Sequence, residues 1–128
     1  MRILLDTHTL LWWMTTDQHL SKSAHALIKN RDNTSLVSAV SAWEIATKVR
    51  LGRLPTAVDL IHNFVEDLTR ERIDTLPVTA EHGIRAGLLP GPHQDPFDRM
   101  LIAQALAENV PIVSNDSALD GYGVNRLW

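Results

Sequence analysis

Short apolar runs alternate along this chain with segments in which apolar residues recur every three or four positions. The runs predict brief strands over residues 3–5, 35–37, 73–76, 112–114 and 125–127. Helical segments between strands favour parallel pairing, because a parallel pair requires a crossover connection. We therefore expect an α/β fold with a central, mostly parallel sheet of four or five short strands flanked by helices.

Four main helices are predicted between the strands, at about residues 21–30, 41–51, 58–68 and 96–108. Ser21 is placed to cap the first helix, and Gly52 follows the second as a C-terminal stop. Asp95 and Pro96 combine an N-cap with a proline in the first turn, which is typical of a helix start. The third helix carries an apolar stripe of Val58, Ile61, Val65 and Leu68.

Length and composition favour a single folded domain. The 128 residues are 45% hydrophobic and 21% charged, close to the balance of globular chains, so we expect one domain over residues 1–128. We expect no export signal, and no apolar run approaches the roughly 20 residues that span a bilayer. The chain has no cysteine, which suits a reducing compartment. These features predict a cytoplasmic protein without a membrane segment.

The net charge limits how this chain could bind nucleic acid. Twelve Lys and Arg against fifteen Asp and Glu give a formal charge of −3, and such a field repels a polyanion. Binding to RNA would therefore need local cations or a bound metal ion. Zinc is not expected, because cysteine is absent and no two histidines lie three or four positions apart on a helix.

Two acids stand just beyond the ends of predicted strands. Open α/β sheets carry their functional crevice at the carboxyl ends of the strands. Asp6 directly follows the first strand, and Asp116 lies two residues after the fourth. Each also has a structural interpretation, because Asp6 could cap a helix that begins near Thr9 and Asp116 could cap a turn that begins at Ser117. Taken singly, each position favours capping.

Two more acids lie within helices. Asp98 shares the apolar side of its helix, which leaves open either a functional role or a capping box in which its carboxylate accepts from the Asp95 amide. His93, in the preceding loop, could approach a substrate, but a lone loop histidine is more often solvated and is assigned no catalytic role. Glu44 falls roughly opposite the apolar stripe of its helix, and Lys48 four positions later predicts an exposed ion pair.

Four blocks of sequence contain these acids. They read LLDTHTLLWW at residues 4–13, SAVSAWEIA and KVRLGRL at residues 38–46 and 48–54, DPFDRMLIAQA at residues 95–105, and SND at residues 114–116. In this order the blocks resemble the PIN-domain ribonucleases, specifically the VapC toxins of bacterial type II toxin–antitoxin pairs. The resemblance spans essentially the whole chain and implies a single PIN-like domain.

The resemblance implies that four acids act together as one quartet, namely Asp6, Glu44, Asp98 and Asp116. It therefore overrules the pattern-based prediction of an exposed Glu44. It also implies cleavage of RNA, a homodimer, and a cognate antitoxin that covers a hydrophobic groove and blocks the acidic pocket. Trp12 and Trp13 give a short helix more apolar surface than one stripe buries, so part of this surface is expected to face a partner.

Converging carboxylates need a cation or protons. Two carboxylates about 4 Å apart repel each other by roughly 4 kcal/mol at an effective dielectric constant near 20. Oxygen ligands select hard ions, so Mg²⁺ or Mn²⁺ is the expected cofactor. Such an ion would hold a phosphate oxygen, activate a water and stabilise the leaving oxygen. We expect Asp6 and Asp98 to bind the ion most directly, with Glu44 and Asp116 completing the site or orienting the water.

Several polar residues near these acids could contact an RNA chain, whose phosphates attract cations. The candidates are Lys48, Arg50, Arg53 and Arg99, together with Ser114, which stands where threonine is commoner in the family. A solvated charged face is the alternative interpretation of the basic residues.

Other functions use acids at similar positions. An aspartate-nucleophile phosphatase needs a second aspartate two residues after the first, where this chain has His8, so this class is disfavoured. The intact quartet argues against a degenerate PIN-like scaffold. The remaining alternative is a metal- or phosphate-binding α/β regulatory module without nuclease turnover.

Overall fold

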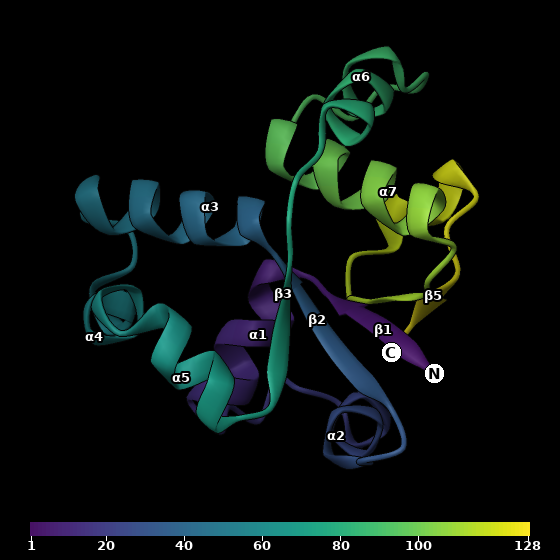
Figure 1. The fold of residues 1–128 in the computed structure, drawn as a ribbon. Helices are drawn as coiled ribbons and strands as arrows, with labels where there is room; N and C mark the ends of the chain where they lie inside the picture. The colour runs from purple at the N-terminus through teal and green to yellow at the C-terminus, as the bar shows by residue number, and fades with distance from the viewer.

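Five parallel strands form the centre of the molecule. The computed structural model describes all residues 1–128, and its strands are β1 (Arg2–Leu5), β2 (Thr34–Ser38), β3 (Ile73–Leu76), β4 (Ile112–Val113) and β5 (Arg126–Leu127). They are ordered β3-β2-β1-β4-β5, and every neighbouring pair is parallel. Figure 1 shows β3, β2 and β1 at the centre of the molecule. This arrangement confirms the predicted α/β class.

Helices connect successive strands. They are α1 (Thr7–Met14), α2 (Lys22–Lys29), α3 (Ala39–Arg50), α4 (Val58–His62), α5 (Phe64–Arg70), α6 (Ala80–Leu88) and α7 (Pro96–Glu108), with short 3₁₀ turns η1 (Pro55–Ala57) and η2 (Ser117–Tyr122). Helix α3 begins two residues earlier than predicted, because the Ser38 hydroxyl accepts from the Val40 amide at 3.0 Å and caps it. None of the helices combines the length and apolarity of a membrane span.

The helices differ from the sequence predictions in two places. The single helix expected over residues 58–68 is interrupted at Asn63, whose backbone angles of φ −121° and ψ 28° separate α4 from α5. This break leaves Val65 of the predicted stripe 67% exposed. Helix α6 was not predicted at all. It packs on α7 through a short face that includes buried His82 and Ala86, while Ile84 stays exposed.

Successive residues of a strand point to opposite faces of the sheet, and they pack into two separate cores, one on each face. Ile3 and Leu5 pack into one core with residues of α1, α2 and α5, whereas Leu4 packs into the other with residues of α7. Figure 1 shows α6 on the outer side of α7, away from the sheet. Both faces of the sheet are therefore covered, and its carboxyl edge is left for the ends of strands and the starts of helices.

The strand order places a topological switch point beside β1. From β1 the chain extends the sheet through β2 to β3 on one side, and it later returns to add β4 and β5 on the other. Residues that follow β1 and β4 therefore meet at the crevice between diverging connections, which is the usual ligand site of open α/β sheets.

Candidate active site

A polar cavity of about 400 Å³ opens at this switch point. No apolar side chain lines it, and its ten lining residues are Asp6, Thr7, His8, Glu44, Lys48, Asp95, Asp98, Asn115, Asp116 and Ser117. The structure thus brings all four acids of the predicted quartet to one cavity, although they are far apart in the sequence. Helices α1, α3 and α7 each contribute to it, as does the segment after β4.

Asp6 and Asp116 are held by the backbone of the segments they begin. Asp6, which is 9% exposed, caps α1 by accepting from the Thr9 amide at 2.8 Å through Oδ1. Asp116 caps η2 by accepting from the Ala118 amide at 3.0 Å, also through Oδ1. Both capping predictions are confirmed. Each cap uses one carboxylate oxygen and leaves the other available for a cation.

Glu44 is buried rather than solvated, so the pattern-based prediction of an exposed side chain is wrong. It is 4% exposed, and its Oε1 accepts from the Thr7 hydroxyl at 2.7 Å. Its Oε2 lies 2.5 Å from the Lys48 ammonium, so the predicted pair exists but has one buried partner. The Thr7 hydroxyl also lies 2.9 Å from that of Ser41. The spacing of apolar residues in α3 could not predict this burial, because polar contacts bury this side of the helix and it carries no apolar stripe.

Asp98 pairs with His93 rather than completing a capping box. Its Oδ2 lies 3.0 Å from His93 Nε2, and the Asp95 amide that a capping box would use instead faces His93 Nδ1 at 3.4 Å. Asp95 itself caps α7, as predicted, because its carboxylate accepts from the Phe97 amide at 2.9 Å and from the Asp98 amide at 3.3 Å. Sequence patterns did not predict the pairing of His93 with Asp98, because only the position of His93 two residues before the N-cap pointed to it.

The electrostatics of the cavity favour added positive charge. Burial, as the largest cause, and the negative charge of Asp95 together raise the pKa of Asp98 to about 6, and His93 opposes the rise. Glu44 and Asp116 add smaller contributions in the same direction as Asp95. The negative charges of Asp95, Glu44 and Asp116, which raise this pKa, would also favour a cation bound among them.

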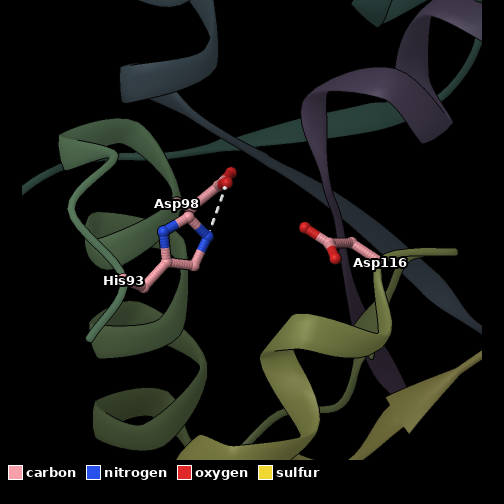
Figure 2. A group of neighbouring side chains, drawn as sticks. All are labelled: His93, Asp98 and Asp116. Atoms are coloured by element: carbon pink, nitrogen blue, oxygen red, sulfur yellow. Dashed lines mark ion pairs between the residues drawn. The ribbon is translucent and has the colours of Figure 1, made fainter. Parts of the chain in front are cut away.

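The donor set suits a hard divalent ion. Ligand atoms of His93, Asp98 and Asp116 lie within 4.8 Å of one another (Figure 2), and Asp6 lines the same cavity. Mostly oxygen donors, with one imidazole at the edge, fit Mg²⁺ or Mn²⁺ better than zinc or copper.

The predicted RNA-contacting residues occupy different places. Lys48 lines the cavity, and Arg50 and Arg53 are exposed near the end of α3, outside the lining. Ser114 is fully buried, and its hydroxyl accepts from the Asp116 amide at 3.0 Å, so it supports the site and has no surface for RNA.

Arg99 also supports the site from behind. Its guanidinium donates to the carbonyl groups of Ala86 at 3.2 Å, of His93 at 2.8 Å and of Leu89. These three bonds tie the end of α6 and the following loop to α7. The structure therefore does not bring Arg99 to the cavity as a free cation.

Comparison with known proteins agrees with this architecture. Residues 3–125 match the sequence model of the PIN-domain family. The chain is 30% identical over 121 residues to Ribonuclease VapC22 of Mycobacterium tuberculosis, which covers 94% of this chain and 91% of that relative.

Solved structures show the same fold at low sequence identity. A toxin–antitoxin complex from Klebsiella pneumoniae contains a chain with a TM-score of 0.68 at 10% identity, covering 98% of this chain and 96% of that one. VapBC2 from Rickettsia felis, bound to a promoter DNA fragment, gives a TM-score of 0.65 at 17% identity, and the match covers 99% of this chain and 98% of that one. The chain therefore belongs to the PIN-domain family, and within it to the VapC proteins.

Proposed function

We propose that this protein is a ribonuclease toxin that hydrolyses RNA phosphodiester bonds with a divalent metal ion bound among Asp6, Glu44, Asp98 and Asp116. The observation that carries the proposal is the convergence of these carboxylates on one cavity without apolar lining. Membership of the VapC proteins supports RNA as the substrate, because the relative that matches nearly the whole chain is named a ribonuclease.

The residues of the cavity have distinct tasks in this proposal. Asp6, Asp98 and Asp116 would bind Mg²⁺ or Mn²⁺ through the oxygens that their caps and His93 leave available. Glu44, fixed by the Thr7 hydroxyl, would complete the site or orient the attacking water. When bound, the ion supplies charge that holds a phosphate oxygen, lowers the pKa of a water and stabilises the leaving oxygen.

The positive groups near the cavity would guide the RNA backbone. Lys48 lines the cavity and pairs with Glu44, so a phosphate oxygen entering there would meet its ammonium. Arg50 and Arg53 are placed further out, where flanking phosphates would pass. The bound ion and these cations together would offset the repulsion expected from a net charge of −3.

We also propose a homodimer and a cognate antitoxin as partners, acting in the cytosol. Solved neighbours include a toxin–antitoxin complex and VapBC2, which supports an antitoxin. A cavity of about 450 Å³ lies beside α1 and is lined in part by Trp12, Trp13, Met14 and Leu20. This surface would accept apolar side chains of the antitoxin. Coexpression should give a complex without nuclease activity, and full activity of a saturated complex would contradict inhibition.

The test is cleavage of defined RNAs by the purified protein in Mg²⁺ and after EDTA treatment, with the product ends mapped. We expect cleavage in Mg²⁺, no cleavage in EDTA and recovery when Mg²⁺ is added back. Because water is the proposed nucleophile, a 2′-deoxy substitution at the cleaved position should still permit cleavage. Binding of Mg²⁺ without cleavage of any RNA would instead favour the regulatory module without turnover.

A further inference from the structure

His93 belongs to a loop and lies beside two acids of the cavity, Asp98 and Asp116, although it does not itself line the cavity. Its side chain is 19% exposed, and its Nε2 lies 3.0 Å from Oδ2 of Asp98. Figure 2 shows the imidazole ring beside Asp98, with Asp116 across the opening. Since the ligand atoms of these residues lie within 4.8 Å of one another, Nε2 could either donate to Asp98 or bind a metal ion directly.

The main chain of His93 is fixed from two sides. Its amide donates to the Tyr122 hydroxyl at 2.7 Å, and its carbonyl accepts from Arg99 at 2.8 Å. Gly91 permits the close approach of Tyr122, because its φ is +119° and a Cβ there would lie 2.5 Å from a ring carbon. The loop therefore presents the imidazole at one place instead of leaving it in solvent.

The second ring nitrogen of His93 indicates the tautomer. Nδ1 lies 3.4 Å from the backbone nitrogen of Asp95, and a backbone N–H group can only donate a hydrogen bond. In the neutral imidazole Nδ1 therefore has to accept, which leaves the ring proton on Nε2, facing the Asp98 carboxylate. If Nε2 bound a metal ion directly, the ring proton would move to Nδ1. The Nδ1–H group and the Asp95 N–H group would then face each other as two donors without an acceptor.

We propose that His93 is a positioning residue that donates from Nε2–H to Asp98 and holds this carboxylate in the orientation in which it binds a divalent ion. The inference rests on the proposed function, since it assumes a metal site. Hydrogen bonds to metal ligands commonly set ligand orientation, and their loss typically weakens metal binding or activity by about 10- to 100-fold. With Oδ2 of Asp98 held by His93, Oδ1 is left for the ion.

Two substitutions separate the roles of the two ring nitrogens. In His93→Gln the side-chain amide reaches the place of Nε2 and can donate to Asp98. In His93→Asn the shorter side chain can replace only Nδ1 and accept from Asp95. His62→Asn, which changes an exposed histidine on α4, is the control.

Titration calorimetry with Mg²⁺ and with Mn²⁺, without RNA, measures the effect on metal binding. We expect the dissociation constant of His93→Asn to rise by about 10- to 100-fold and that of His93→Gln to stay within about threefold of the parent. Parental affinity of folded His93→Asn would overturn the positioning role. A parent that binds neither ion would overturn the proposed function itself.

Nitrogen NMR of the parent tests the tautomer without any variant. In metal-free protein with ¹⁵N-labelled histidine, we expect the ring proton of His93 on Nε2. A ring proton on Nδ1 with none on Nε2 would overturn the inference. So would a nitrogen hyperfine coupling in the Mn²⁺-loaded parent that disappears in His93→Asn, because it would show that His93 binds the ion directly.

Discussion

At the scale of single residues, the three aspartates of the site are each fixed through one oxygen and keep the other available, whereas both oxygens of Glu44 have partners. Oδ1 of Asp6 and of Asp116 accept backbone amides, and Oδ2 of Asp98 faces His93. The caps at Asp6, Asp95 and Asp116 could be predicted from sequence, because capping depends on neighbours two or three positions away. The partner of Asp98 could not, because it depends on how Tyr122 and Arg99 place the preceding loop.

Replacing Asp98 with asparagine is expected to stabilise the metal-free protein. Burial and neighbouring acids raise the pKa of Asp98 to about 6 from its ordinary 3.8, so its contribution to stability falls as pH rises from about 4 to about 6. At pH 7.5 in EDTA we expect Asp98→Asn to raise the free energy of unfolding by on the order of 1 kcal/mol, because partial exposure to solvent screens the full effect.

Urea unfolding of parent and Asp98→Asn measures this difference. Asp59→Asn, at an exposed position of α4, is the matched control and should leave stability nearly unchanged. In Mg²⁺ the order should reverse, since only the parent gains free energy by binding the ion. A metal-free Asp98→Asn protein that is less stable than the parent would contradict this interpretation of the cavity.

Proton binding by Asp98 also predicts how metal affinity depends on pH. Protons and Mg²⁺ compete for this carboxylate, whose pKa is about 6. We therefore expect the apparent affinity for Mg²⁺ to be about tenfold weaker at pH 5 than at pH 7, and to level off above pH 7. Calorimetry across this range measures it. An affinity that is constant from pH 5 to pH 7 would argue that Asp98 is not a ligand.

At the scale of helices and strands, the predictions depended on the spacing of apolar residues and on the length over which that spacing continues. Strands β1, β2 and β3 were predicted closely. β1 and β2 contain a short apolar run, whereas β3 has apolar residues only at its two ends. Helix α6 was missed because Gly83 and Gly87 weaken its helical pattern, and its apolar residues Ile84 and Leu88 face solvent, 64% and 78% exposed. The break at Asn63 was also missed, because an apolar repeat can continue across two helices that meet at an angle.

Arg99 forms a clamp of three hydrogen bonds, and these predict which segment becomes more mobile when the Arg99 guanidinium is removed. Its guanidinium donates to three carbonyl groups that end α6 and lead into the loop before Asp95. We expect Arg99→Gln to lower the free energy of unfolding by about 2 kcal/mol, as for hydrogen bonds made by charged groups. Hydrogen exchange should quicken at residues 86–95 and stay unchanged in α3. Arg85→Gln, at an exposed position of α6, is the control; parental exchange in Arg99→Gln would refute the clamp.

At the scale of the whole molecule, the sheet topology gathers acids that the sequence keeps far apart. The order β3-β2-β1-β4-β5 puts the ends of β1 and β4 side by side, so Asp6 and Asp116 lie at one crevice. Glu44 joins them from α3, and only the family resemblance indicated it. Polar contacts between distant elements, such as Thr7 with Glu44, leave no periodic trace in a single sequence.

The central claim is that these acids form one metal-dependent site for RNA cleavage, and its most direct test is the cleavage rate of Asp6→Asn and Asp98→Asn in Mg²⁺. Each variant is first shown to be folded by circular dichroism, and Asp59→Asn serves as the control. We predict that both site variants cut RNA at least about 100-fold more slowly than the parent, while Asp59→Asn keeps the parental rate. Folded Asp6→Asn and Asp98→Asn proteins that cut RNA at the parental rate would contradict the claim.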